Sequence, residues 1–176
     1  MTGWTRAYLS IGSNKGDTGK NLDQAAETLT REINIRVLAE SGRYKTAPQN
    51  FADQDWFLNA VLEIDTCLSP EALLKRLKNI ESELDPEGKD FRFGPRIIDL
   101  DIVLFGDQVL KTDHLEIPHP RMHQRCFVLK PLSDLVPDLV HPRLNQTIQQ
   151  LLEQMNTQEN QEVIPLEQEE NREIFH

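Results

Sequence analysis

The pattern of apolar and polar residues predicts a strand and then an amphipathic helix at the start of the chain. Residues 6–11 (RAYLSI) are typical of a strand, and residues 12–17 (GSNKGD) are rich in turn-forming types. In the next segment apolar residues recur three or four positions apart, which indicates a helix with one buried face. The residues on that face are Leu22, Ala25, Ala26, Leu29 and Ile33.

The middle of the chain predicts two further strands and a second helix. Residues 36–41 and 57–64 are expected to be strands, with a long loop over residues 44–55 between them. Ser69 is a favourable helix N-cap, and Pro70 is a favourable first helical residue. The buried stripe of this second helix consists of Leu73, Leu77, Ile80 and Leu84.

The last third of the chain adds one more strand and two more helices. Residues 85–93 are expected to form a flexible loop, residues 98–105 a strand, and residues 118–125 an irregular basic segment. Residues 125–135 and 147–155 have helical patterns. The core order of elements is therefore β-α-β-β-α-β, with additions at the C-terminal end.

This order predicts the α+β class: a ferredoxin-like antiparallel sheet with helices packed on its faces, plus C-terminal additions. The length of 176 residues suits one domain, which is expected to span residues 1–155. Residues 156–176 contain six glutamates against one arginine, about half of the formal net charge of −10. We expect this acidic tail to be solvated and flexible.

Composition narrows the range of partners. An acidic chain argues against nonspecific nucleic-acid binding, which depends on lysine and arginine neutralising phosphates. No apolar run approaches the roughly 20 residues that a membrane helix needs, and no secretory signal is recognisable. Cys67 and Cys126 lie far apart without metal-type spacing, so we expect reduced thiols in a cytoplasmic protein.

Two aspartates in the strand at residues 98–105 are the most informative feature. Alternation places Asp99 and Asp101 on one face, about 7 Å apart. Two like charges in an otherwise apolar strand need compensation, and magnesium is often held by one or two carboxylates plus substrate phosphates. The alternative is a solvated acidic face, or pairing with Arg96. The opposite face is expected to be core and consists of Ile98, Leu100, Ile102 and Leu104.

Basic residues gather around this strand in the sequence. Arginine suits bidentate phosphate contacts, so the group predicts a phosphate site, although each member alone also fits a surface charge. His119 stands between two prolines and has a second interpretation as a turn residue that caps a neighbouring carbonyl group. The group consists of Arg92, Arg96, His119, Arg121, His123 and Arg125.

Phe57 and Asn59 share a face of their strand, where an aromatic ring and an amide are able to grip a flat heterocycle. An Asn bonded to nearby backbone is an equally good interpretation. Glu81, on the second helix, is either a ligand contact or a surface residue. Residues 12–14 (Gly-Ser-Asn) fit no phosphate-loop spacing and are interpreted as a turn.

Residues 94–106, Gly-Pro-Arg-x-x-Asp-Leu-Asp-Ile-Val-Leu-Phe-Gly, resemble the defining motif of the hydroxymethyldihydropterin pyrophosphokinases. Three further segments agree with that family in order and spacing, and the resemblance covers roughly residues 6–152. These segments are residues 8–14, residues 44–48 with 57–60, and residues 117–122 with 125–132.

The resemblance implies an enzyme of folate biosynthesis. Its substrates are ATP and 6-hydroxymethyl-7,8-dihydropterin, its products are AMP and the pterin diphosphate, and it needs two Mg2+ ions. It is further expected to act as a monomer in the cytoplasm, with neither a membrane nor nucleic acid as partner.

The resemblance also implies a role for each matching residue. Asp99 and Asp101 would hold the magnesium ions, and Arg96 and Arg92 would join them in catalysis. The residues expected to bind ATP are Glu81, Lys89, Arg96, His119 and Arg125. The residues expected to bind the pterin are Thr46, Pro48, Phe57, Asn59, Phe93 and Phe127.

The chain departs from the family pattern in the loop after the second helix. Where relatives often have two arginines that clamp ATP, this chain has Pro86 and Gly88, and only Lys89 and Arg92 remain. The departure bears on ATP affinity and loop closure. It keeps two other functions open: a non-catalytic relative that binds pterin or nucleotide, and another magnesium-dependent nucleotidyltransferase.

Overall fold

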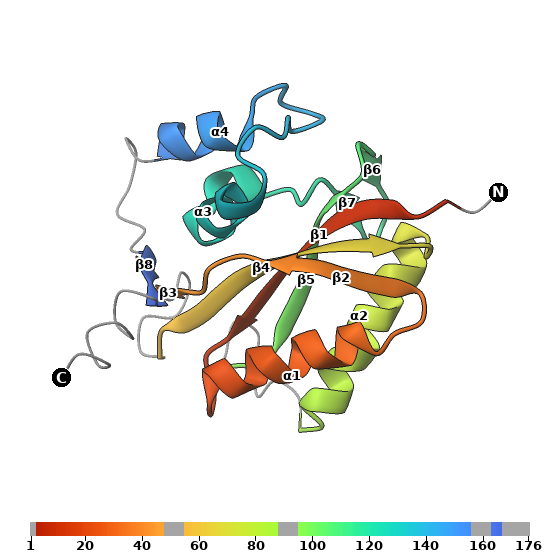
Figure 1. Cartoon of the computed structure of the whole chain (residues 1–176), viewed down its shortest axis with the longest axis vertical. Coiled ribbons are helices and arrows are strands. Elements are labelled where there is room, and N and C mark those ends of the chain that lie inside the picture. The colour runs from red at the N-terminus through yellow and green to blue at the C-terminus, as the bar shows by residue number, and fades with distance from the viewer. Residues whose placement is uncertain (1–2, 48–54, 88–94, 156–162, 167–176) are drawn as a thin grey trace.

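A six-stranded antiparallel sheet forms the central layer of the described part of the chain (Figure 1). The computed structural model describes residues 3–47, 55–87, 95–155 and 163–166. The strands run in the order β5-β1-β4-β3-β8, and β2 also pairs with β4. Their bounds are β1 Thr5–Ser13, β2 Ile35–Glu40, β3 Tyr44–Thr46, β4 Phe57–Thr66, β5 Asp99–Phe105 and β8 Val163–Pro165.

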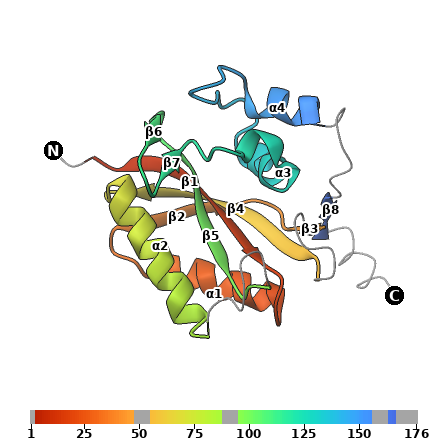
Figure 2. The same ribbon diagram turned by 180° about the vertical axis from the view of Figure 1, so that it is seen from behind.

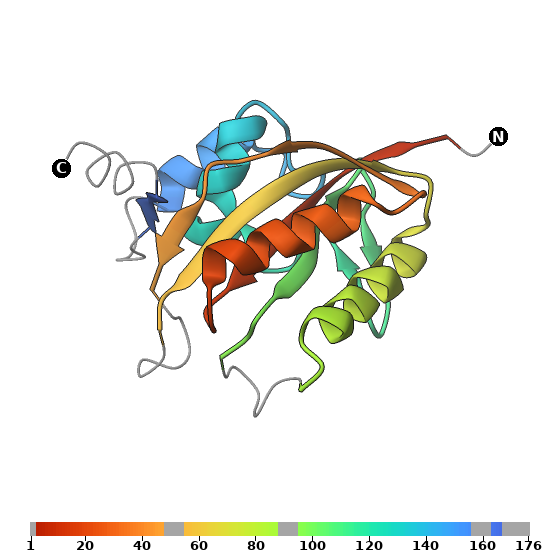
Figure 3. The same cartoon turned by 60° about the horizontal axis from the view of Figure 1, so that its bottom comes forward.

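Helices cover both faces of the sheet. α1 (Thr18–Thr30) and α2 (Pro70–Leu84) lie across one face, as Figure 3 shows. α3 (Cys126–Leu135) and α4 (Ile148–Met155) pack on the other face. A small pair of strands, β6 (Leu110–Lys111) and β7 (Glu116–Ile117), completes the layout with a 3-10 turn at Met122–Gln124. The expected ferredoxin-like α+β fold is confirmed.

Local signals set the starts of the first two helices. Ser69 accepts a 3.1 Å hydrogen bond from Ala72 N–H and Pro70 begins α2, as predicted. Asp17 caps α1 in the same way. Because α1 ends at Thr30, Ile33 is not on its buried face and is 86% exposed, so the expectation that Ile33 belongs to that face was wrong.

None of the described helices is long and apolar enough to span a bilayer.

A β-bulge changes the predicted face of β5. Ile102 packs in the core beneath α1 and α2, as expected, but Leu104 packs in the cluster beneath α3. Leu9 pairs with Ile102 whereas Tyr8 pairs with Leu104, so Val103 is an extra residue in β5. The extra residue reverses the alternation after it, and the prediction that Leu104 shares the core face was wrong for that reason.

The expected loop over residues 44–55 is partly a strand. Tyr44–Thr46 forms β3, which pairs with the first half of β4, while β2 pairs with the second half. Ser41 joins the two pairings: its N–H donates to the Val61 carbonyl at 2.9 Å, and its Oγ accepts from the Val61 N–H at 2.8 Å. The ladder along β4 is therefore continued across the gap.

The C-terminal segment adds an unexpected strand. Val163–Pro165 pairs with β3 as β8, at the edge of the sheet. The expected flexibility of the other residues in 156–176 stays a prediction, since they lie outside the described residues.

Candidate active site

Asp99 and Asp101 lie in the edge strand β5, beside α2 (Figure 2). They are paired with Gly12 and Ser10 of β1 and come before the bulge, so strand alternation keeps them on one face. Their side chains are 24% and 36% exposed. The predicted pair of accessible carboxylates is thus present.

Each carboxylate faces a basic side chain. Arg96 Nη1 lies 3.1 Å from Asp99 Oδ2, so the pairing considered from the sequence does occur. Lys78 Nζ lies 3.9 Å from Asp101 Oδ1. Arg96 Nε is buried and has no hydrogen-bond partner among the residues that the structure describes. A buried donor of this kind is costly unless a ligand satisfies it, which fits a site for an anion such as phosphate.

Glu81 and Lys78 connect α2 to the edge of β5. Glu81 Oε2 accepts a 2.7 Å hydrogen bond from Leu100 N–H, and Glu81 Oε1 lies 3.2 Å from Lys78 Nζ. Burial lowers the pKa of Lys78, but Glu81, Asp101 and Asp99 together raise it above its ordinary value. Lys78 was missed in the sequence, although its position three residues before Glu81 on one helix was a usable signal.

The electrostatics of the pair suit a divalent cation. Burial raises the pKa of Asp101, and repulsion from Asp99 raises it further, against the attraction of Lys78, Arg125 and Arg96. Within the described ranges, no three His, Cys, Asp or Glu side chains form a metal cage. Two carboxylates with open sides nevertheless fit magnesium, which takes its other ligands from water and substrate phosphates.

His119 is held as a neutral hydrogen-bond donor. The backbone N–H of His119 donates to the Val103 carbonyl oxygen at 2.9 Å, and the ring atom Nδ1 accepts from the backbone N–H of Arg121 at 3.1 Å. Burial lowers the pKa of His119 to about 4, with Arg125 and Arg121 adding to the shift. With Nδ1 occupied as an acceptor, the ring proton lies on Nε2, which is available to donate to a ligand. The turn role considered from the sequence and a ligand role are compatible.

Asn59 is aligned by a buried side-chain pair. Its Nδ2 donates to Thr46 Oγ1 at 2.6 Å, so two expected pterin residues meet across β3 and β4. Gly12, opposite Asn59 on β1, has no side chain, and a Cβ there would lie 2.5 Å from Asn59 Oδ1. A side chain at position 12 would therefore displace the Asn59 amide from this orientation.

Asn14 is a positioning residue that the sequence analysis missed. Its Oδ1 accepts from Arg96 N–H at 2.8 Å, its N–H donates to Arg96 O at 3.0 Å, and its Nδ2 donates to Asp55 O at 3.2 Å. β1 runs on to Ser13, so the turn predicted at residues 12–14 was wrong for its first two residues. This segment carries the clamp that fixes the backbone of Arg96.

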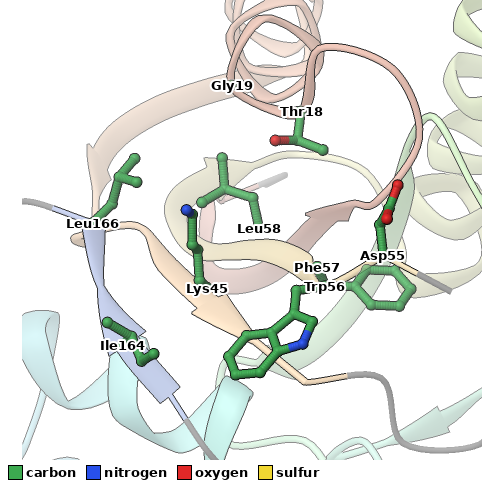
Figure 4. A pocket seen from close by; sticks show the side chains of 9 residues that line it. All are labelled: Thr18, Gly19, Lys45, Asp55, Trp56, Phe57, Leu58, Ile164 and Leu166. Carbon is green, nitrogen blue, oxygen red and sulfur yellow. The ribbon is translucent and has the colours of Figure 1, made fainter. Parts of the chain in front are cut away.

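The expected aromatic sandwich of the pterin between Phe57 and Phe127 stays a prediction. Phe57 is half-buried and lines a cavity of about 570 Å3 beside the start of α1 (Figure 4). Phe127 is half-buried in α3, with the Arg125 guanidinium 5.5 Å from its ring centre. The other expected site residues, Pro48, Lys89, Arg92 and Phe93, lie outside the described residues.

Comparison with known proteins decides the family. Residues 8–137 match the model of 7,8-dihydro-6-hydroxymethylpterin-pyrophosphokinase (HPPK). The chain belongs to the HPPK family. It is a pyrophosphokinase, and its reaction is a pyrophosphate transfer in folate biosynthesis.

Curated relatives of this HPPK chain are of two lengths. It is 44% identical to the pyrophosphokinase of Methylorubrum extorquens over 77% of the chain and 85% of that protein. For the pyrophosphokinase of Bacillus subtilis the identity is 43%, over 73% of the chain and 77% of that protein. The folic acid synthesis protein of Schizosaccharomyces pombe is 45% identical over 86% of the chain, but the chain spans only 21% of its length.

Solved structures support the HPPK fold. The wild-type Plasmodium falciparum HPPK-DHPS structure with pteroate superposes with a TM-score of 0.72, covering 90% of this chain and 44% of that one. At 17% identity this likeness speaks for the fold alone. The family match includes β5 and α3 but ends before α4 and β8.

Proposed function

We propose that Asp99 and Asp101 hold two magnesium ions, and that the chain transfers the pyrophosphoryl group of ATP to 6-hydroxymethyl-7,8-dihydropterin. The products are AMP and the pterin diphosphate. The observation that carries the proposal is the pair of accessible carboxylates on one face of β5, in which burial and repulsion from Asp99 raise the pKa of Asp101. Such a pair gains most from a bound cation.

Three residues next to the pair are suited to hold the phosphates. Arg96 offers a buried Nε that has no partner among the described residues, and Asn14 fixes its backbone. His119 offers a neutral Nε2–H donor. Arg125 stands at the N-cap of α3, close enough to Asp101 for their charges to interact. Glu81, fixed to the β5 edge, is assigned to the nucleotide.

The pterin site lies beside these groups on the same face of the sheet. Asn59 and Gly12 are paired residues of β4 and β1, and Gly12 is also paired with Asp99. The Asn59 amide, held by Thr46, is assigned to the polar edge of the pterin. Phe57 and Phe127 are assigned to its two ring faces, and they stay predictions from the family resemblance.

The transfer depends on positioning and charge neutralisation more than on covalent chemistry. The pterin hydroxymethyl oxygen attacks the β-phosphorus of ATP, and AMP leaves. When bound, magnesium neutralises phosphate charge and aligns the attacking and leaving oxygens. The protein residues hold the substrates: Arg96 and His119 donate to phosphate oxygens, and Asn59 fixes the orientation of the alcohol.

We also propose that the working unit is a monomer, as expected from the sequence. The wide spacing of Cys67 and Cys126 in the sequence, without a metal-type pattern, supports the cytoplasm as the compartment. Sedimentation velocity with and without ATP measures the oligomeric state, and a stable dimer would contradict the proposed monomer. Fractionation of the producing cells measures the compartment.

The deciding experiment incubates the protein with magnesium, ATP and the dihydropterin alcohol and measures AMP. We expect AMP to appear only when the pterin is present. The Asp101→Asn variant should lose at least about 100-fold in turnover while keeping its fold. Asp107→Asn is the matched control, since Asp107 lies exposed in the turn after β5.

The two other functions give different results in this assay. Binding of both ligands without AMP formation is the result expected of a non-catalytic relative. Pyrophosphate release that does not depend on the pterin is the result expected of a nucleotidyltransferase. Near-normal turnover of Asp101→Asn at saturating magnesium would remove the assigned role of the carboxylate pair.

A further inference from the structure

The strand β8 belongs to a segment that the family match does not include, yet it is part of the central sheet. Its three residues pair with all three residues of β3: Val163 with Thr46, Ile164 with Lys45, and Pro165 with Tyr44. The ladder continues one residue further, where Leu166 N–H donates to Arg43 O at 2.8 Å. β3 is therefore enclosed between β4 and β8.

The far end of β3 carries a residue of the proposed pterin site. Tyr44, at the beginning of β3, is anchored to α3 because its hydroxyl donates to Asp134 Oδ2 at 2.5 Å. Thr46, at the end of β3, is buried between its neighbours in β4 and β8. A three-residue strand without β8 would be a short sheet edge, which has little stability of its own.

Apolar side chains fix β8 to the rest of the domain. Leu166 packs against the core cluster beneath α1 and α2. Ile164 and Leu166 also line the cavity of about 570 Å3 near Lys45 and Trp56, as Figure 4 shows. β8 is thus attached by its backbone and by the partly buried side chains of Ile164 and of Leu166, the residue after it, and its position is transmitted to β3.

We propose that β8 is a positioning element of the pterin site. By holding β3 in place it fixes Thr46 Oγ1, and Thr46 Oγ1 fixes the amide of Asn59 through their 2.6 Å hydrogen bond. The C-terminal segment then sets pterin affinity without touching the pterin. This inference rests on the proposed function, because it uses the assignment of Thr46 and Asn59 to the pterin.

The ladder geometry supplies a sharp test. Hydrogen-bonded and non-hydrogen-bonded pairs alternate in an antiparallel ladder. Because Leu166 and Arg43 form a bonded pair, Ile164 N–H faces β3, while the backbone of residues 163 and 165 faces away. The natural proline at position 165 agrees with this alternation, since proline has no N–H to donate.

The test compares two prolines in the full-length chain. Ile164→Pro removes an N–H that faces β3, whereas Val163→Pro, one residue away, removes an N–H that faces outward. Ile164→Val keeps the strand and serves as the conservative variant. Calorimetry measures the affinity for the dihydropterin alcohol, with magnesium and a non-hydrolysable ATP analogue present. Steady-state kinetics gives KM and kcat for each substrate, and thermal unfolding gives Tm.

We expect Ile164→Pro to weaken pterin affinity about tenfold or more, and to raise the pterin KM by a similar factor. Its affinity for the ATP analogue should stay within about twofold of the parent, as a sign that the fold is intact. Val163→Pro and Ile164→Val should keep parental pterin affinity. Equal losses of pterin and ATP affinity in Ile164→Pro would overturn the inference, because they indicate general destabilisation.

Asn59→Ala separates this inference from the proposed function. If Asn59→Ala loses pterin affinity while Ile164→Pro does not, β8 has no positioning role and the proposed site stands. If neither variant changes pterin affinity, the assignment of Asn59 fails, and the inference fails with it. If both lose pterin affinity and keep ATP affinity, both proposals are supported.

Discussion

Gly12 and Asn59 approach so closely that any side chain at position 12 would collide with the amide of Asn59. A Cβ at Gly12 would lie 2.5 Å from Asn59 Oδ1. The two residues are paired across β1 and β4, and the amide of Asn59 is held by its 2.6 Å hydrogen bond to Thr46 Oγ1. The absence of one side chain in β1 thus permits the amide orientation that the proposed pterin site needs.

Gly12→Ala should therefore reduce both pterin affinity and stability. We expect the free energy of unfolding to fall by about 1–3 kcal/mol, because the methyl group overpacks a buried site. Pterin affinity should fall more than ATP-analogue affinity, as measured by calorimetry. Gly3→Ala is the control, since a Cβ at Gly3 would have no heavy atom within 4 Å. Unchanged pterin binding in Gly12→Ala would show that the Asn59 amide does not bind the pterin.

Phe57→Ala should mainly weaken pterin binding, with little effect on ATP, if the ring stacks on the pterin. Loss of one aromatic face should cost about tenfold in affinity. Trp56→Ala is a demanding control, because Trp56 is the neighbouring aromatic residue and lines the same cavity near α1. If the two variants lose pterin affinity equally, the loss reflects the cavity wall and not stacking by Phe57.

Lys78→Met should destabilise the protein most when magnesium is absent. Lys78 is the positive charge shared by Glu81 and Asp101, so its removal leaves carboxylates that repel one another. The loss should be about 1 kcal/mol, since the side chain of Lys78 is 46% exposed to solvent.

Saturating magnesium should reduce the loss of stability in Lys78→Met, because a bound cation replaces the missing positive charge. Thermal unfolding of the variant and the parent, with magnesium and with a chelator, measures the difference. Lys75→Met, an exposed lysine on the same helix, is the control. A difference in Tm that is the same in both conditions would contradict a shared site for Lys78 and the metal.

His141 should make the fold sensitive to acid. It is 3% exposed, and its Nδ1 accepts hydrogen bonds from the N–H groups of Arg143 and Leu144. Burial lowers the pKa of His141 to about 4, with His123 and Arg143 adding to the shift. The unfolded chain takes up a proton near pH 6.5, so between about pH 6.5 and 4 the unfolded state binds more protons and stability falls as pH falls.

His141→Gln should flatten this dependence. Between about pH 7 and 5 the parent should lose on the order of 1–2 kcal/mol more than the variant in its free energy of unfolding. Denaturant titration at both pH values measures the two slopes, and the difference between proteins removes the contribution of other groups. His114→Gln, an exposed histidine, should keep the parental slope. An unchanged slope in His141→Gln would show that His141 is not the titrating group.

Features encoded in short stretches of chain were accessible from the sequence. The cap at Ser69 and the spacing of Leu73, Leu77 and Ile80 define α2 by local hydrogen bonding and helical periodicity. Asp99 and Asp101 share a face because side chains alternate along any strand. These properties depend on neighbours within a few residues, so no knowledge of the partner strands was needed.

Features that depend on distant partners were decided by the tertiary structure. The bulge at Val103 exists only through the register with Tyr8 and Leu9, and it moved Leu104 to the other face. β3 is too short to be recognised alone, since it is a strand only because β4 and β8 pair with it.

The electrostatics of the site were decided in the same way. Lys78 reaches Asp101 because α2 packs along the edge of β5, and Asn14 clamps Arg96 across 82 residues of sequence. The sequence alone determined which chemistry is available, namely the carboxylate pair and its strand. Packing between segments far apart in the chain determined the charges, hydrogen bonds and close contacts around that pair, because these forces act through space and not along the backbone.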